Sequence, residues 1–326
     1  MRPRVYVTQP VAASALERLR AVADVELNPN SLHIVTKNEL LAAVRDRDIL
    51  FCLLHDRVDR DVIAAGTRLR AIASMKITPS DIDVTAATAR RIPVTVIAPI
   101  VTEATADMHF ALLLAVARRV VEGDQLVRAG SFPGAQSAHL LGAWVYGRTI
   151  GLIGGGGRIG RAVAMRARGF SMRTLYWTPR RKPESEEREV GLEYVPYDRL
   201  LAESDFVSVH APLNPDTRHL VGERELRLMK PTAFLINTAR GPIVDEKALV
   251  RALAERRIAG AGLDVFENEP RVEPELLTMP NVVLTPHLGS AVTELRESMA
   301  NVVVNNILAV LGGRQPPNCW NSEIYD

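Results

Sequence analysis

A strand-like run that leads directly into a glycine-rich turn constrains the fold of this chain more than any other feature. Residues 149–153 read Thr-Ile-Gly-Leu-Ile, the pattern of a buried strand, and residues 154–160 read Gly-Gly-Gly-Gly-Arg-Ile-Gly before a helical stretch. Gly155, Gly157 and Gly160 match G-x-G-x-x-G, a turn that lets the backbone approach a pyrophosphate at a helix N-terminus. The additional glycine also permits the register Gly154-x-Gly156-x-x-x-Gly160. Both registers predict a dinucleotide-binding loop.

Short β-branched runs alternate with helical patterns along the chain, which favours parallel sheets joined by βαβ crossovers. The first block contains five candidate strands, at Arg4–Thr8, Val25–Asn28, Ile49–Leu54, Leu69–Ser74 and Pro93–Ile97. The second block contains six, at Thr149–Gly154, Arg173–Trp177, Phe206–His210, Ala233–Ile236, Gly260–Val265 and Val282–Thr285. Six strands are typical of a sheet made from two mononucleotide-binding halves. We expect an α/β protein with two doubly wound domains, a Rossmann dinucleotide-binding domain and a flavodoxin-like substrate domain.

Two helices indicate where these domains meet. Residues 102–122 are expected to form one long helix, with Thr102 as its N-cap and Gly123 marking its end. A final helix over about residues 291–311 is expected to return to the first domain, because six strands would complete the second sheet. The substrate domain would then comprise residues 1–99 and 288–326, and the dinucleotide-binding domain residues 100–287.

Composition excludes several classes of protein. The chain has 326 residues, of which 47% are hydrophobic, so it can bury two ordinary cores. Apolar runs such as 110–117 are far shorter than the ~20 residues of a membrane span. The chain enters its first strand at once, without room for a signal sequence, and we expect a cytoplasmic protein. Cys52 and Cys319 suggest neither a disulfide framework nor a metal site, and a net charge of +2 is too small to indicate nucleic-acid binding.

Three residues in the C-terminal third have the chemistry of a hydride-transfer site. Arg240 can hold an anionic substrate, because its planar fork matches a carboxylate. His287 can protonate the alkoxide that forms when hydride reaches a carbonyl carbon. Glu269 can accept the other N–H of the imidazole, which fixes the tautomer and stabilises the charged ring. These three residues are the predicted catalytic group.

The segment after the second strand of this domain bears on cofactor choice. An NAD-selective site would carry Asp or Glu after Trp177, to bind the ribose 2′-hydroxyl. This chain has Thr178, with Arg180, Arg181 and Lys182 close behind. Because a carboxylate is absent and cations are near, we expect NADP(H) to be preferred and NAD(H) to remain possible.

An ordered set of motifs gives the chain a resemblance to a known family. They are Thr102–Asp107, the glycine loop, His210–Leu213, Asn237–Gly241, Gly262–Glu267 with Glu269-Pro270, and Thr285–His287. With these motifs the chain resembles the D-isomer-specific 2-hydroxyacid dehydrogenases over nearly its whole length, and the glyoxylate/hydroxypyruvate reductases among them most. The resemblance implies Arg240 as the carboxylate binder, Glu269 as the partner of the histidine and His287 as the acid/base. It also implies a homodimer, in which an arm like Val127–Gly147 reaches over the partner.

The resemblance places further residues at the cofactor. Thr105, Ala239 and Asp264 would lie near the nicotinamide, and His210, Ala211, Pro212 and Thr217 near the adenosine. The full expected cofactor-binding set also contains the glycines Gly155, Gly157 and Gly160 and the residues Arg158, Ile159, Thr178, Arg180, Arg181, Thr238, His287 and Gly289.

One loop departs from the family pattern. Where the family usually has a glycine-rich loop whose N–H groups meet the substrate carboxylate, this chain reads Ser-Met-Lys-Ile-Thr-Pro-Ser-Asp over residues 74–81. Pro79 has no N–H, and β-branched Ile77 disfavours the backbone angles that glycine permits. We expect Lys76, Ile77 and Thr78, with Arg240, to bind the substrate, and Lys76 to favour an anion with more charge than one carboxylate. The alternative is that Lys76 points to solvent.

The leading hypothesis is an NAD(P)H-dependent reductase that converts a small 2-keto acid, of the glyoxylate or hydroxypyruvate type, to the D-2-hydroxy acid. Oxidation of another small oxyanion, such as phosphite, is a second enzymatic hypothesis that depends on Lys76. A non-catalytic regulator that senses dinucleotides is a third, because fold alone does not establish activity. The small-molecule substrate and a second copy of the chain are the expected partners, with no nucleic acid and no membrane.

Overall fold

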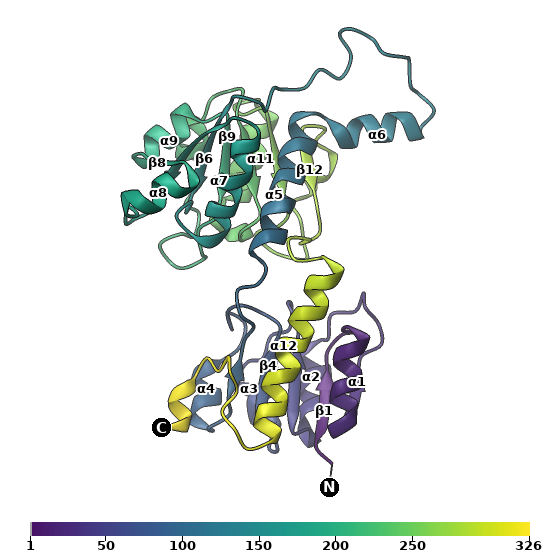
Figure 1. The fold of residues 1–326 in the computed structure, drawn as a ribbon. Coiled ribbons are helices and arrows are strands. Elements are labelled where there is room, and N and C mark those ends of the chain that lie inside the picture. Colours follow the sequence, from purple (N-terminus) through teal and green to yellow (C-terminus); the bar gives the residue numbers. More distant parts are fainter. Residues whose placement is uncertain (1) are drawn as a thin grey trace. The chain divides into compact units, whose positions relative to one another are not determined.

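The computed structural model describes residues 2–326, which form two compact units (Figure 1). Unit 1 contains the residues up to Ile100 together with Val292–Asp326, and unit 2 contains Val101–Ala291. The division at 100/101 lies one residue from the expected 99/100, and the division at 291/292 lies four residues from the expected 287/288.

Unit 1 contains a five-stranded sheet in which every paired strand is parallel, in the order β2-β1-β3-β4-β5. Its strands are β1 (Arg4–Val7), β2 (Asp24–Leu27), β3 (Ile49–Cys52), β4 (Ala71–Ser74) and β5 (Val94–Thr95). Every residue of β3 and β4 is buried, as expected for central parallel strands that are covered on both faces. The order 2-1-3-4-5 is that of a flavodoxin-like sheet.

Several helices of unit 1 begin at side chains that cap their free N–H groups. The helices are α1 (Ala13–Val22), α2 (Lys37–Ala43), α3 (Arg60–Ala65), α4 (Val84–Ala89) and α12 (Thr293–Leu311), with short 3-10 turns η1 (Val44–Asp46) and η4 (Ser322–Tyr325). Thr36 and Glu39 form a capping box at α2, and Asp59 and Asp83 cap α3 and α4. The last long helix, α12, packs on α1 and β4 and therefore belongs to unit 1.

Unit 2 contains a seven-stranded parallel sheet in the order β12-β11-β10-β9-β6-β7-β8. Its strands are β6 (Thr149–Ile153), β7 (Arg173–Trp177), β8 (Leu192–Tyr194), β9 (Phe206–Val209), β10 (Phe234–Asn237), β11 (Gly260–Leu263) and β12 (Val282–Leu284). The expectation of six strands was wrong, because it missed β8. This edge strand has three residues and only one of them, Leu192, is buried, so its sequence carries little strand pattern.

Two hydrophobic cores lie against opposite faces of this sheet. The helices of unit 2 are α5 (Thr102–Ala117), α6 (Val120–Arg128), α7 (Arg158–Gly169), α8 (Glu184–Val190), α9 (Tyr197–Glu203), α10 (Glu223–Leu228) and α11 (Glu246–Ala254), with η2 (Gly241–Ile243) and η3 (Pro274–Thr278). Ile150 and Leu152 of β6 pack with α5 and α7, whereas Ile153 packs with α9, α10 and α11. Because successive side chains of a strand face opposite ways, β6 contributes to both cores.

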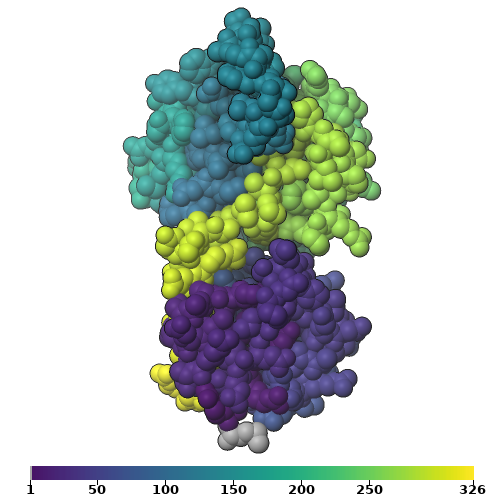
Figure 2. Space-filling model, turned by 90° about the vertical axis from the view of Figure 1, so that its right-hand side faces the viewer, coloured from purple at the N-terminus to yellow at the C-terminus, as the bar shows by residue number. Residues whose placement is uncertain are grey.

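The single helix expected over residues 102–122 is two helices. Arg119 adopts a left-handed conformation with φ +53°, which ends α5 and allows α6 to start in a new direction. Thr102 is the first helical residue, and Val101 occupies the N-cap position. In Figures 1 and 2, α6 and the segment that follows it protrude from the rest of unit 2. No residue of α6 is buried.

Two histidines lie together where α5 meets the sheet, and His109 is fully buried whereas His210 is half-buried. The rings of His109 and His210 have centroids 5.4 Å apart, and neither nitrogen of His109 has a hydrogen-bond partner within residues 2–326. Burial lowers the pKa of His109 well below 6.5 and that of His210 to about 3. The folded protein therefore keeps both rings neutral in conditions where the unfolded chain would protonate them.

This pair predicts instability in acid. The unfolded chain takes up protons below a pKa of 6.5 and the folded chain does not, so stability is lost as pH falls from 6.5 towards the folded pKa, about 3 for His210. A histidine that stays neutral throughout this range contributes a loss of about 2 kcal/mol between pH 7 and pH 5. His109→Leu should shrink the difference between urea midpoints at these two pH values, whereas His139→Ala, at an exposed position, should not. An unchanged pH difference in His109→Leu would contradict this account.

Candidate active site

Three neighbouring strands of unit 2 bring the predicted catalytic residues to one edge of the sheet. Arg240 follows β10, Glu269 follows β11 and His287 follows β12, and these strands pair in the order β12-β11-β10. Because the strands are parallel, their carboxyl ends lie together, at the edge where open α/β sheets bind ligands. These residues are far apart in the sequence, but the pairing of their strands brings them close together in space.

His287 and Glu269 form a hydrogen-bonded pair. Nδ1 of His287 lies 2.9 Å from Oε2 of Glu269, and the two side chains are 26% and 20% exposed. The other carboxylate oxygen of Glu269 accepts a hydrogen bond from the backbone N–H of Phe266 at 3.0 Å. The carboxylate is therefore fixed on both sides, and it directs the imidazole so that Nε2 is the nitrogen that can exchange a proton with a substrate.

The backbone at His287 adopts an uncommon conformation. Its φ is +57°, in the left-handed region that side chains other than glycine rarely enter. The N–H of His287 donates to the carbonyl of Asp264 at 2.9 Å. Backbone conformations of this kind persist only where surrounding contacts determine them, and they are frequent at functional sites.

The carboxylate of Asp264 holds the loop that carries His287. Its Oδ1 accepts from the hydroxyl of Thr285 at 2.7 Å and from the N–H of Leu288 at 2.6 Å, and its Oδ2 accepts from the N–H of Gly289 at 2.8 Å. Asp264 is only 1% exposed. Thr105 of α5 donates its hydroxyl hydrogen to the carbonyl of Gly289 or of Val101. The expected cofactor residues Asp264, Thr105 and Gly289 are thus brought together, and Asp264 also supports His287.

Arg240 lies on a turn that the neighbouring strand shapes. Asn237 accepts from the N–H of Ala239 at 3.0 Å and donates to the carbonyl of Arg240 at 3.1 Å. A Cβ on Gly241 would lie 1.9 Å from the backbone of Phe266, so only glycine allows this close approach. The Arg240 side chain is exposed, donates to the carbonyl of Ala239 at 2.6 Å and, within residues 2–326, makes no ion pair. Its charge is therefore available to an anionic ligand.

The glycine loop has the geometry of a dinucleotide cradle. Gly157 is the N-cap of α7, and a Cβ on Gly160 would lie 2.5 Å from Gly155, so these glycines let the helix pack closely on the loop. Gly154 has φ +82° and abuts the backbone of His210 and Ala211. Arg158 and Ile159 form the first turn of α7, which contains no acidic residue. Such a helix N-terminus favours the negative charge of a phosphate.

A buried hydroxyl supports the fit of a nicotinamide cofactor. Oγ1 of Thr238, at the end of β10, is buried and has no hydrogen-bond partner within the described residues. A buried hydroxyl without a partner is costly, and a bound ligand would satisfy it. Among the residues expected near the adenosine, Ala211 is buried, while the hydroxyl of Thr217 donates to the carbonyl of Pro212 at 2.6 Å and shapes the loop. The loop, this hydroxyl and the Asp264 region together fit a dinucleotide.

The cations after β7 have different surroundings. Arg181 pairs with Glu187 through two contacts of 2.8 Å, and Tyr176 donates its hydroxyl to the same carboxylate at 2.7 Å. The guanidinium of Arg181 is therefore already bound to the carboxylate of Glu187 within unit 2. Lys182 instead lies along the glycine loop, because a Cβ on Gly156 would lie 2.8 Å from its Cγ.

Thr178 and Arg180 precede these two cations in the chain. Both are accessible, and the hydroxyl of Thr178 donates to the carbonyl of Arg180 at 2.6 Å. Sequence reasoning counted Lys182 among the nearby cations but left it out of the cofactor-binding set. Only the folded loop shows that Lys182, rather than Arg181, lies against a glycine of the cradle.

The loop after β4, in unit 1, holds Lys76 in an ion pair. The ammonium of Lys76 contacts the carboxylate of Asp81, and the lysine side chain is only 10% exposed. This pairing lowers the pKa of the Asp81 carboxyl against the opposing effect of burial. Ile77 is half-buried and Thr78 is exposed. Lys76 does not point to solvent, and Asp81 offsets the charge that we expected it to offer a substrate.

Residues 2–326 lack two other features. No cluster of three or more His, Cys, Asp or Glu side chains in this range could hold a metal ion. No helix in the same range combines the length and the apolar character that a membrane span requires.

Comparisons with known proteins identify relatives over the whole chain. The family model described as "D-isomer specific 2-hydroxyacid dehydrogenase, NAD binding domain" matches residues 110–289, which lie within unit 2. The chain is 45% identical to a glyoxylate reductase of Thermococcus litoralis, with 99% of this chain and 98% of that protein covered.

Solved structures agree with this relationship. The TT0316 protein of Thermus thermophilus has a TM-score of 0.89 and 43% identity, covering 97% of this chain and 99% of that one. An NADPH-dependent glyoxylate/hydroxypyruvate reductase of Sinorhizobium meliloti, in complex with NADP and malonate, has a TM-score of 0.84 and 32% identity, covering 98% and 97%. Unit 2 is accordingly a Rossmann NAD-binding domain. The chain belongs to the D-isomer-specific 2-hydroxyacid dehydrogenase family and is an NAD(P)-dependent oxidoreductase that acts on the CH–OH group.

Proposed function

We propose that the protein is an NAD(P)H-dependent reductase of small 2-keto acids, with glyoxylate and hydroxypyruvate as its preferred substrates. The observation that carries the proposal is the His287–Glu269 pair, held at the sheet edge that also bears Arg240. The names of the Thermococcus and Sinorhizobium relatives support the choice of substrate. Reduction of hydroxypyruvate creates a stereocentre, and its D-configuration follows the family name.

Each residue of the group has a separate task. The guanidinium of Arg240 binds the substrate carboxylate through two parallel hydrogen bonds, which orients the keto group. His287 donates a proton from Nε2 to the keto oxygen as that oxygen gains negative charge. Glu269 keeps Nδ1 protonated and stabilises the imidazolium, so it acts as a positioning residue. The nicotinamide, when bound, supplies the hydride to the keto carbon.

The cofactor is held by unit 2. The pyrophosphate would be held by the N–H groups of the glycine loop and of the first turn of α7, including Arg158 and Ile159. Thr238 would offer the cofactor a hydroxyl that has no hydrogen-bond partner within residues 2–326, and Ala239 and Asp264 would flank the nicotinamide. NADP(H) is preferred because Thr178 leaves room for a 2′-phosphate, with Arg180 and Lys182 as the cations that pair with it. Arg181 contributes less to binding of the 2′-phosphate, because its guanidinium already forms an ion pair with Glu187.

The other hypotheses have less support. Oxidation of phosphite requires Lys76 to offer net positive charge, and Asp81 offsets that charge. Lys76, Ile77 and Thr78 are proposed to contact the substrate. A regulator without catalysis does not need the His287–Glu269 pair. NADP+ reduction with phosphite at a rate comparable to NADPH oxidation with glyoxylate would favour the phosphite hypothesis, and tight cofactor binding without turnover would favour the regulator.

We also propose a cytoplasmic homodimer. The protruding segment exposes large apolar side chains, among them Phe132, 62% exposed, and Trp144, 71% exposed. Exposed apolar patches of this kind mark interaction sites, and the resemblance to family dimers supports a second copy as the partner. Cys52 and Cys319 are both free thiols, which suits a reducing compartment.

Substitutions in the catalytic group should separate its tasks. His287→Gln should lower kcat on the order of 100- to 10,000-fold, because proton donation is lost. Glu269→Gln should lower kcat, because the imidazole loses the carboxylate that orients it. Arg240→Lys should raise KM for the keto acid. His33→Gln is the matched control, because His33 forms a 2.9 Å pair with Glu39 in unit 1. Steady-state NADPH oxidation measures all four, and normal kcat in His287→Gln would refute the assignment.

Cofactor choice should depend on Arg180 and Lys182. The double substitution Arg180→Ala/Lys182→Ala should lower the ratio of kcat/KM for NADPH to that for NADH on the order of 10- to 100-fold, because charge-assisted hydrogen bonds to the 2′-phosphate are lost. Arg188→Ala, at an exposed position of α8, should leave the ratio unchanged. Arg181→Ala should lower the melting temperature, because it breaks the contacts with Glu187. It should change the ratio of kcat/KM values less than the double substitution does. A double variant that keeps the wild-type ratio would contradict the NADP(H) assignment.

The dimer can be tested by sedimentation velocity. The wild-type protein should sediment at twice the mass of the chain, and Phe132→Ser/Trp144→Ser should shift it towards one chain mass because the apolar contact is lost. Leu32→Ser is the control, since Leu32 is a highly exposed leucine of unit 1. A wild-type protein that stays at one chain mass at all concentrations would exclude the dimer.

A further inference from the structure

The hydroxyl of Tyr176, on β7, makes two hydrogen bonds to residues that follow this strand. It donates to a carboxylate oxygen of Glu187, on α8, at 2.7 Å and accepts from the backbone N–H of Lys182 at 2.9 Å. Tyr176 is fully buried, and Glu187 is only 6% exposed. A buried polar group that loses its partner is costly, because water does not replace the lost bond. This one hydroxyl therefore fixes the backbone at Lys182.

The carboxylate of Glu187 keeps the Tyr176 hydroxyl in its orientation. Two nitrogens of the Arg181 guanidinium donate to this carboxylate, each at 2.8 Å, and the contact lowers the pKa of the Glu187 carboxyl. Burial and then the hydrogen bond to Glu187 raise the pKa of Tyr176 to about 12. At neutral pH the phenol therefore keeps its proton, donates it to Glu187 and accepts from Lys182.

Tyr176 also contacts the glycine loop of the dinucleotide cradle. A Cβ on Gly155 would lie 2.8 Å from the Cβ of Tyr176, so the loop passes directly against this residue. A Cβ on Gly156 would lie 2.8 Å from Cγ of Lys182 and 3.0 Å from its Cε. The Lys182 side chain therefore extends along the loop at Gly156, while Tyr176 holds the backbone from which that side chain starts.

Lys182 depends on Tyr176 more than its neighbour Arg181 does. Within residues 2–326, the bond to Tyr176 is the one hydrogen bond of Lys182, and its ammonium makes no ion pair. Arg181 is held separately, by its contacts with Glu187. The lysine side chain is a long flexible stem, so a fixed backbone reduces the freedom that its ammonium loses when a ligand binds.

We propose that Tyr176 is a positioning residue for NADP(H): its hydroxyl holds Lys182 where the ammonium meets the 2′-phosphate, and it thereby contributes to the choice of NADP(H) over NAD(H). The inference rests on the proposed preference for NADP(H). Tyr176 does not bind the phosphate itself, because its hydroxyl is already bonded twice inside the protein. Its effect is therefore confined to the phosphorylated cofactor and requires the Lys182 side chain.

Fluorescence titration with NADPH and NADH tests the inference without turnover. Tyr176→Phe should bind NADPH about three- to tenfold more weakly than wild type, the effect of one lost hydrogen bond, and NADH within about twofold of wild type. Phenylalanine keeps the ring and the Cβ, so unit 2 should fold, which the melting temperature checks. Tyr197→Phe is the matched control, because it removes a tyrosine hydroxyl that donates to the carbonyl of Leu220 at 2.8 Å. It should keep the affinity for both cofactors.

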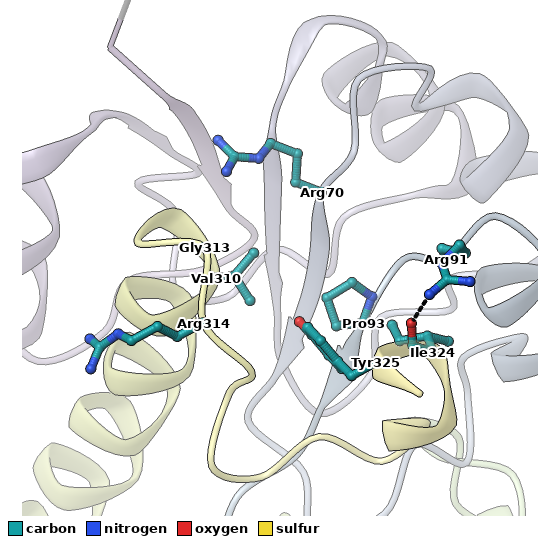
Figure 3. A pocket seen from close by; sticks show the side chains of 8 residues that line it. All are labelled: Arg70, Arg91, Pro93, Val310, Gly313, Arg314, Ile324 and Tyr325. Atoms are coloured by element: carbon teal, nitrogen blue, oxygen red, sulfur yellow. Dashed lines mark hydrogen bonds between the residues drawn. The ribbon is translucent and has the colours of Figure 1, made fainter.

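A double-mutant cycle shows whether Tyr176 acts through Lys182. Lys182→Ala should weaken NADPH binding on the order of tenfold, because a charge-assisted contact is lost. Adding Tyr176→Phe to Lys182→Ala should weaken it by less than about a further twofold, because the positioned group is already gone. Arg314→Ala removes one positive charge beside a hollow of about 370 Å³ in unit 1 (Figure 3) and should leave NADPH affinity unchanged.

The outcomes separate this inference from the proposed function. Wild-type protein that binds NADH as tightly as NADPH would overturn the NADP(H) preference and the inference with it. If the wild type prefers NADPH and Tyr176→Phe keeps the full preference, the inference alone is wrong. It is also wrong if the affinities for NADPH and NADH fall equally in Tyr176→Phe, if the losses of Tyr176→Phe and Lys182→Ala multiply fully, or if Lys182→Ala binds NADPH normally.

Discussion

The buried carboxylate of Asp264 determines the shape of the loop on which the proton donor lies. One side chain accepts hydrogen bonds from Thr285, Leu288 and Gly289, and its own carbonyl accepts from His287. A buried carboxylate needs several donors to offset the loss of water. The loop supplies them by adopting a shape in which His287 has a left-handed backbone. The orientation of the imidazole towards Glu269 depends on this arrangement.

The rest of the site is assembled from the same sheet edge by close backbone contacts. Gly241 allows the turn that bears Arg240 to lie against Phe266, and the N–H of Phe266 in turn holds Glu269. The anion-binding arginine and the carboxylate that orients His287 are thus tied to one another through backbone. Catalytic geometry is more precise on rigid elements than on free loops, because less reorganisation is needed when the substrate binds.

Sequence patterns predicted the parts of the structure that depend on local order. The glycine loop, the alternation of strands and helices and the candidate residues Arg240, Glu269 and His287 are all readable from neighbouring residues. Strand β8 was missed because three residues with one buried side chain show almost no hydrophobic periodicity. The break between α5 and α6 was missed because it occurs at Arg119, where neither glycine nor proline signals a turn.

Pairings between distant residues were beyond the reach of those patterns. The sequence shows three adjacent cations, but only the fold shows that Glu187 occupies Arg181 while Lys182 lies along Gly156. Lys76 likewise reads as an available charge until Asp81 is placed beside it. The donors to Asp264 come from residues 21 to 25 positions later in the chain. In each case the charge of a side chain is visible in the sequence and its partner is not.

A crystal structure of the protein with NADP+ and oxamate, an unreactive analogue of a small 2-keto acid, tests the central claim most directly. The account predicts the oxamate carboxylate on the Arg240 guanidinium, and Nε2 of His287 about 2.6 to 3.2 Å from the oxygen that stands in for the keto group. The Glu269–His287 hydrogen bond should be intact. Oxamate bound away from Arg240, or a His287 ring turned away from both Glu269 and the ligand, would contradict the assignment of these residues as anchor and proton donor.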